Sequence, residues 1–140
     1  MAAGHRISSL SAGLLVYDIL SNDSGVTERV NKIFPVVSEE GAQLPYICYR
    51  RSSAEIMPVK GSCGPDSIGM EVVCYAATYA ESIAIAEAVR SALDGISAEY
   101  EDDDGDALVA RSSLLTDAEE SWDAGAYFQL LSFQVRINNV

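Results

Sequence analysis

The sequence predicts an α+β fold, an antiparallel sheet with two main helices packed on one face, in the order helix, strands, helix, strands. Three observations predict it: an apolar first segment that ends in helix-breaking residues, a capped alanine-rich segment in the middle, and alternating strands around that segment. The chain has 140 residues, 49% of them apolar, and no uninterrupted apolar run long enough to cross a membrane. We therefore expect a single domain over residues 1–140.

The first helix is expected to begin at Ser8 or Ser9, either of which can cap it, and to end near Leu20. Residues 1–7 before it are expected to be flexible. The apolar side chains point in two directions, with Leu10, Leu14 and Tyr17 on one side and Leu15, Val16 and Ile19 on the other. A helix that is apolar nearly all round must be covered on more than one side, and we expect another subunit to supply the second cover.

Two prolines mark the strands that follow. Pro35 forces Phe34 out of the helical region, which predicts an extended segment at residues 33–37, and Pro45 opens a clear strand at residues 46–51. The next strand, residues 68–78, is apolar on both faces and is therefore expected to be central. The segment KGSCGPDS between these two strands, which contains Cys63, is expected to be a bend.

The second helix is the best marked element of the chain. Thr78 and Glu81 have the spacing of a capping box, and Gly95 is placed to end the helix. Residues 94–106 hold seven acids and no base, so residues 96–107 are expected to form an acidic loop. A weak strand at 108–115, a turn at 123–125 and a strictly alternating last strand with one wet face complete the prediction.

The composition argues against catalysis and against tight binding of nucleic acid. A net charge of −12 makes the chain a poor candidate for binding the phosphate backbone of a nucleic acid. His5 is the only histidine, so a Ser-His-Asp or Cys-His mechanism has no placed base. The segment DDDGD looks like part of a calcium loop, but Arg111 stands where the bidentate glutamate should be, so a solvated loop is expected instead. The sequence thus predicts no enzyme, no metal and no cofactor.

Four motifs, in their order and spacing, resemble one known family, the tail completion or tail terminator-like proteins of long-tailed phages and prophages. The resemblance spans residues 8–138. The motifs are IFP at 33–35, LPYICY at 44–49, VVCYAATYAESIAIAEAVRSALDG at 72–95 and FQLLSFQVRI at 128–137.

The resemblance implies a structural virion protein without catalytic residues. Such proteins assemble in the bacterial host cytoplasm and form a ring, usually a hexamer, on the head-proximal end of the tail tube in the virion. The implied partners are copies of the chain itself, the tail tube protein and a head-completion or connector protein. DNA passes through the ring without being bound specifically. A head–tail stopper or adaptor and, from a different class, a monomeric ligand-binding or regulatory domain remain as alternatives.

Two sets of candidate site residues follow. Arg50 and Arg51 close a strand, either as a solvated strand end or with a salt bridge to an acidic neighbour. The candidate subunit interface consists of Leu10, Leu14, Tyr17, Ile83, Arg50 and Arg51. Acids that face the channel or its rim, either some of those between residues 101 and 106 or those between Asp117 and Asp123, would discourage DNA from sticking, although an outward loop is the alternative. The candidate channel or rim acids are Glu101, Asp102, Asp103, Asp104 and Asp106.

Overall fold

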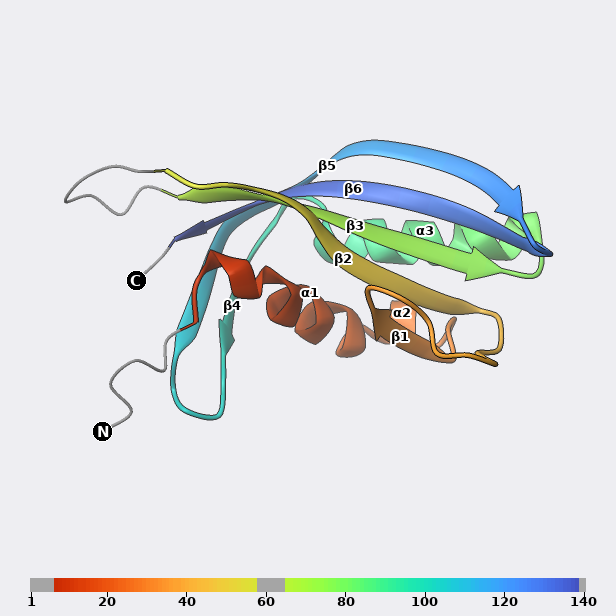
Figure 1. The fold of residues 1–140 in the computed structure, drawn as a ribbon, viewed down its shortest axis with the longest axis horizontal. Coiled ribbons are helices and arrows are strands. Elements are labelled where there is room, and N and C mark those ends of the chain that lie inside the picture. The colour runs from red at the N-terminus through yellow and green to blue at the C-terminus, as the bar shows by residue number, and fades with distance from the viewer. Residues whose placement is uncertain (1–6, 58–64, 139–140) are drawn as a thin grey trace.

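The structure is a computed structural model that describes residues 7–57 and 65–138 (Figure 1). The helical elements are a 3₁₀ turn η1 (Ser9–Ser11), α1 (Ala12–Ser21), α2 (Ser24–Thr27) and α3 (Tyr79–Leu93). The strands are β1 (Lys32–Pro35), β2 (Tyr46–Glu55), β3 (Asp66–Ala76), β4 (Ile96–Glu101), β5 (Ala107–Asp123) and β6 (Ala126–Asn138). His5 and Cys63 lie outside the described residues, as does all of the expected flexible start except Ile7, which packs against the core.

The six strands form one curled sheet in the order β1-β2-β3-β6-β5-β4. β1 runs parallel to β2, with Lys32 opposite Tyr46, and the other neighbouring strands are antiparallel. β4 and the first part of β5 turn away from the other strands and descend beside α1 (Figure 1). α1 contacts β1, β2 and β4, and α3 contacts β3, β5 and β6, so the helices lie within the curl.

The expected fold class is wrong. The sheet is mixed rather than antiparallel, and strands make up most of the secondary structure of the described residues. The fold has one main helix rather than two, because α3 has 15 residues and α1 only 10. The physical reason lies in residues 36–45, which return the chain without a helix so that β1 and β2 run in the same direction. Alternation of apolar residues indicates a strand but carries no information on the direction of its neighbour.

The segment 96–107, expected to be an acidic loop, contains the edge strand β4 and only a short loop. Glu99 and Glu101 are exposed while Ala98 and Tyr100 alternate with them toward the core, and an edge strand tolerates such outward charges. The loop is reduced to residues 102–106. The Asp102 carboxylate closes it by accepting hydrogen bonds from the backbone N–H groups of residues 104 (3.0 Å) and 106 (2.8 Å).

The caps predicted for the second helix are confirmed. The Thr78 hydroxyl accepts a hydrogen bond from the Glu81 N–H at 3.2 Å, and Gly95 has a φ of +73° just after α3 ends. α3 then buries one stripe, Ile85, Val89 and Leu93, against the helix-facing side of the sheet.

One edge of the sheet is left open over a long stretch. β4 pairs with β5 only as far as Ser113. Among the described residues no strand adds to the outer side of β5 from residue 114 to residue 123, where it continues paired with β6 alone.

Candidate assembly surfaces

An apolar groove of about 350 Å³ lies where the start of α1 meets the end of β1 and the middle of β2. It brings together four of the six residues predicted for a subunit interface, Leu10, Leu14, Arg50 and Arg51. Leu10 is 57% exposed and Leu14 46%, whereas Leu15 and Val16 on the other side of α1 are buried. The two apolar sides of this helix therefore have different roles: one fills the core and the other lines the groove. Ser11, Gly13, Pro35, Val36, Tyr49 and Met70 complete the lining.

The two remaining predicted residues lie outside this groove. Tyr17 is close to it, because its ring centroid is 5.9 Å from that of Tyr49. Ile83 is on the exposed side of α3, one turn after Tyr79, and is not part of the groove.

The adjacent arginines Arg50 and Arg51 point to opposite faces of the sheet and make different contacts. Arg50 forms a salt bridge across the strands to Glu71, with an Nη2–Oε1 distance of 2.7 Å, as one of the two sequence interpretations expected. Arg51 donates a hydrogen bond from Nη1 to the carbonyl oxygen of Leu10 at 2.8 Å. Within the described part of the chain Arg51 has no ion pair, so it leaves an unbalanced positive charge at the groove.

Val36, on the groove wall, has a backbone conformation that is unusual for a β-branched residue. Its φ is +65°, and a hydrogen bond of 2.7 Å from the Val37 N–H to the Pro35 carbonyl closes a three-residue turn around it. A γ-turn of this hand is rare and strained. Its side chain is nevertheless 68% exposed, so the strain does not serve burial in the described chain.

A second apolar cluster surrounds the turn between β5 and β6. Trp122 is 57% exposed and lies opposite Tyr127, whose ring is 6.0 Å from that of Tyr79 at the start of α3. The Tyr79 hydroxyl donates to the Glu120 carboxylate at 2.9 Å, and this hydrogen bond raises the pKa of Tyr79. We call residues 119–127 the hairpin tip. Trp122 is not among the residues predicted from the sequence, although a lone tryptophan beside acids at a predicted turn is a signal that could have indicated it.

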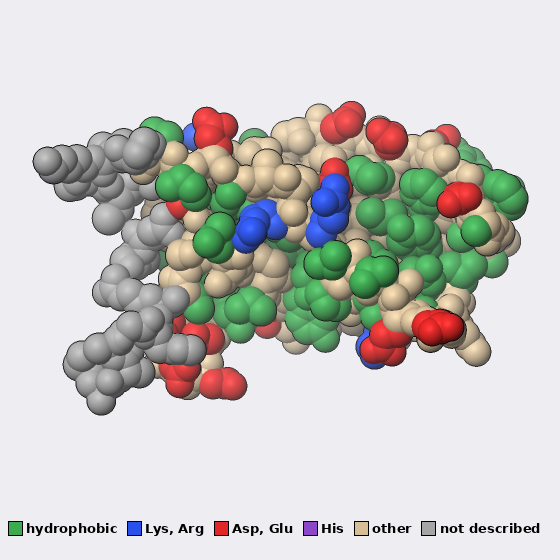
Figure 2. All heavy atoms as spheres, viewed as in Figure 1, with side chains coloured by type: hydrophobic (Ala, Val, Ile, Leu, Met, Phe, Trp, Pro, Cys, Tyr) green, Lys and Arg blue, Asp and Glu red, His purple; other side chains and the backbone are tan. Residues whose placement is uncertain are grey.

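The face of the sheet away from the helices carries a row of aromatic side chains. The ring of Tyr75 is 5.0 Å from that of Tyr46 and 5.6 Å from that of Phe128, and Phe34 meets Tyr46 edge to face. Figure 2 shows hydrophobic side chains gathered over this part of the sheet, toward the hairpin tip. The row was also missed, because it exists only once the strands are aligned in register.

The acidic candidates lie around one tight turn. Asp102 points inward to hold the turn, and Glu101, Asp103 and Asp104 are exposed. In residues 7–57 and 65–138 no group of three His, Cys, Asp or Glu side chains is arranged to hold a metal ion. Burial raises the pKa of the Cys48 and Cys74 thiols, which therefore stay protonated at neutral pH. None of the helices described has the length and apolarity to cross a membrane.

The comparisons with known proteins reveal a likeness of fold. No protein-family model matches the chain, and no curated protein matches it. A solved chain described as belonging to the virion of a native gene transfer agent particle superposes with a TM-score of 0.68 at 16% sequence identity. The match covers 94% of this chain and 98% of that one. At this identity the likeness shows the fold alone. Over nearly its whole length, the chain therefore has the fold of a chain from a gene transfer agent virion.

Proposed function

We propose that this protein is a structural, non-enzymatic virion protein that forms a ring on the head-proximal end of a phage tail tube. There it ends tube polymerisation and joins the tail to the head. The observation that carries the proposal is the fold likeness to the virion chain, which leaves almost nothing of either chain unmatched. The motifs at residues 33–35, 44–49, 72–95 and 128–137, which resemble tail completion proteins, support the same role.

The exposed apolar surfaces support assembly. The groove exposes Leu10 and Leu14, the hairpin tip exposes Trp122, and large apolar patches on a soluble chain mark interaction sites. A ring subunit needs one contact to each neighbour, which joins two different patches, and further surfaces for the tube and the connector. Six copies, as in the family that the sequence resembles, are expected.

Co-assembly with a tail tube protein tests the proposal directly. The chain and the tube protein from the same phage or prophage are expressed together in bacterial cytoplasm, and tube lengths are measured by electron microscopy. We expect short tubes that carry a ring at one end. Tubes of unchanged length, with none of this protein at their ends, would refute the capping role.

The acidic loop supplies a second test. We propose that Glu101, Asp103 and Asp104, with Asp102 and Asp106 shaping the turn, face the channel or its rim and repel the DNA backbone. Replacing residues 102–106 by a Gly-Ser turn of the same length should preserve ring assembly but impair DNA passage. Normal infectivity of a phage carrying this replacement would remove the proposed role of the acids.

Two other functions can be distinguished from the capping role, one by the protein that co-purifies with the chain and the other by the molecular mass of the chain in solution. A stopper or adaptor would co-purify with the portal and adaptor proteins, not with the tube. The groove of about 350 Å³ is also large enough for a small apolar ligand, which is the observation in favour of a monomeric binding domain. A strictly monomeric mass at high concentration, both alone and with the tube protein, would favour that function.

A further inference from the structure

We infer that the groove of one copy receives the hairpin tip of the next copy, with Trp122 as the anchoring side chain. This contact rests on the ring proposed above and identifies the two surfaces that close it. A second copy is the occupant, for the reasons that follow.

The hairpin tip has the composition of an anchor. Trp122 is the only tryptophan in the chain, and more than half of its surface is exposed. Buried tryptophans that fill a partner's pocket commonly dominate the energy of a protein interface. The groove of about 350 Å³, walled by Leu10, Leu14 and Met70, offers an apolar site of the size that one large ring requires.

The charges of the two surfaces are complementary. The hairpin tip and the strand before it carry Asp117, Glu119, Glu120 and Asp123, with no base between Arg111 and Arg136. Arg51 lies at the groove and has no ion pair within the described residues, whereas the charge of Arg50 is balanced by Glu71. In a chain of net charge −12, most pairings of two surfaces would repel, and this pairing attracts.

The shape of the chain makes the contact intermolecular. Figure 1 places the β5–β6 turn at one end of the long axis, while α1 begins toward the other end, so the tip cannot fill its own groove. A contact between two different patches of identical chains is heterologous, and it closes into a ring when the rotation allows. The strained turn at Val36 keeps an exposed apolar side chain on the groove wall, where such a neighbour would cover it.

The fluorescence of the single tryptophan provides the test on the unmodified protein. Its emission can be excited selectively over the seven tyrosines and followed together with molecular mass as the concentration or the amount of tube protein rises. We expect the emission to shift to shorter wavelength, and acrylamide quenching to fall, in step with assembly. Assembly with an unchanged emission would overturn the contact and leave the ring standing.

Two variants with matched controls test the two sides of the contact separately. Trp122→Ala and Arg51→Glu should each weaken assembly by at least about tenfold in concentration. Leu114→Ala, which removes a comparably exposed side chain of β5, and Arg111→Glu, which makes the same change of charge elsewhere, should leave assembly unchanged. Circular dichroism establishes that each variant is folded. Folded Trp122→Ala rings at wild-type concentration would refute the inference.

A trapping experiment identifies the neighbour. In a Cys63→Ser background, Trp122→Cys and Val36→Cys chains are mixed under mild oxidation. The mixture should give a disulfide-linked pair that neither chain forms alone. Rings that form without this mixed pair would overturn the contact. A Trp122→Ala variant that still forms rings but no longer binds the tube protein would also overturn it, because the hairpin tip would then be the surface that binds the tube. A wild-type chain that never assembles, with or without the tube protein, would instead refute the proposed function itself.

Discussion

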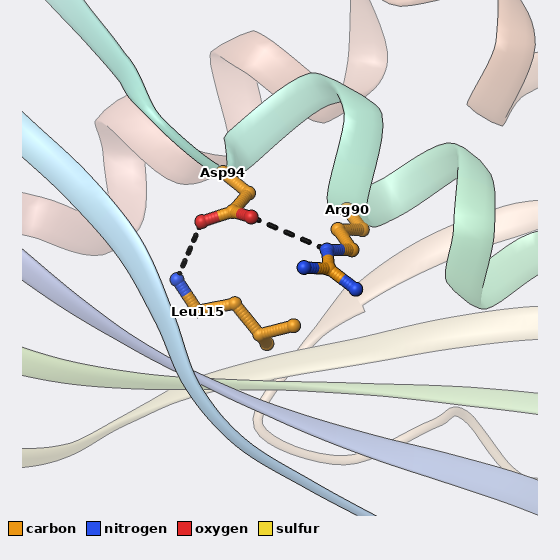
Figure 3. Close-up of polar contacts among 3 residues, drawn as sticks. All are labelled: Arg90, Asp94 and Leu115. Carbon is orange, nitrogen blue, oxygen red and sulfur yellow. Dashed lines mark hydrogen bonds and ion pairs between the residues drawn. The ribbon is translucent and has the colours of Figure 1, made fainter.

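The carboxylate of Asp94 accepts a hydrogen bond from the backbone N–H of Leu115 at 2.8 Å, which ties the end of α3 to β5 (Figure 3). Its other oxygen meets the Nε of Arg90 at 3.2 Å. Leu115 stands where the pairing of β5 with β6 is irregular, between residues 115 and 117. Asp94 therefore satisfies a backbone donor at a bulge and fixes the direction in which the chain leaves the helix.

This hydrogen bond predicts a pH dependence of stability. The Leu115 N–H, followed by Arg90, lowers the pKa of Asp94, although partial desolvation opposes the shift. The stabilisation is present above the pKa of the unfolded chain, about 3.9, and is lost as the pH falls through the lower folded value. Asp94→Asn should lower the melting temperature at pH 7, and its difference from wild type should shrink in acid. Asp103→Asn is the control and should follow wild type. Parallel melting curves for wild type and Asp94→Asn at every pH would contradict the prediction.

The aromatic row predicts a measurable coupling between Tyr46 and Tyr75. Their rings stack at 5.0 Å on adjacent strands, and aromatic pairs contribute about 0.5–1.5 kcal/mol beyond the area that they bury. A double-mutant cycle with alanine, measured by urea unfolding, should give a coupling energy in that range. The same cycle for Tyr46 and Tyr100, which lie toward opposite edges of the sheet, should be additive within about 0.5 kcal/mol. Equal couplings for the two pairs would show that the row has no special energy.

Two glycines should respond to alanine in opposite directions. Gly95 has a φ of +73° after α3, so Gly95→Ala should destabilise the fold by about 1–2 kcal/mol although the space around it is open. Gly13 lies within α1, where an added methyl would meet the Tyr49 ring at an ordinary 3.6 Å. Gly13→Ala should therefore stabilise the fold by about 1 kcal/mol. Chemical denaturation measures both, and changes of the same sign would contradict the assignment of the two conformations.

The buried carboxylate of Asp66 should be important for stability. It accepts hydrogen bonds from the Ser9 hydroxyl at 2.6 Å and from the Met57 N–H at 3.0 Å, and so joins η1, β3 and the segment just after β2. Asp66→Ala should cost about 3 kcal/mol, because it removes the acceptor of two hydrogen bonds at a buried position. Ser9→Ala should cost less, about 1 kcal/mol. If Asp66→Ala unfolds at the wild-type urea concentration, these contacts are not part of what holds the N-terminal segment to the sheet.

Local chemistry explains which parts of the fold could be predicted from the sequence. Thr78, Glu81 and Gly95 act within a few residues of one another, so the bounds of α3 could be read directly. The parallel pairing of β1 with β2 could not, because it depends on the path of the loop between them. The strand β4 could not be recognised in the sequence, because an exposed edge strand and a solvated loop both accept acidic residues.

The candidate surfaces divide in the same way. The two apolar sides of α1 were visible in its periodicity, and one of them does line the groove. The partners of that side in the groove lie at and just after the end of β1, on β2 and on β3, and no pattern within a single element could bring Met70 or Val36 to it. The role proposed for Trp122 likewise could not be predicted from the sequence, because it depends on the long hairpin that places this side chain far from the groove.

The open edge of β5 affects how readily the unassembled chains aggregate. Along residues 114–123 the outward backbone groups of β5 have no strand partner within the described residues, apart from the Leu115 N–H that Asp94 binds. An open edge of this kind can pair with a strand of another chain and lead to aggregation. Four carboxylates lie along this stretch, and the repulsion between those of two chains opposes pairing of their edges. We therefore expect neutral, dilute buffer to keep newly made chains dispersed, and mild acid to precipitate them before it unfolds them.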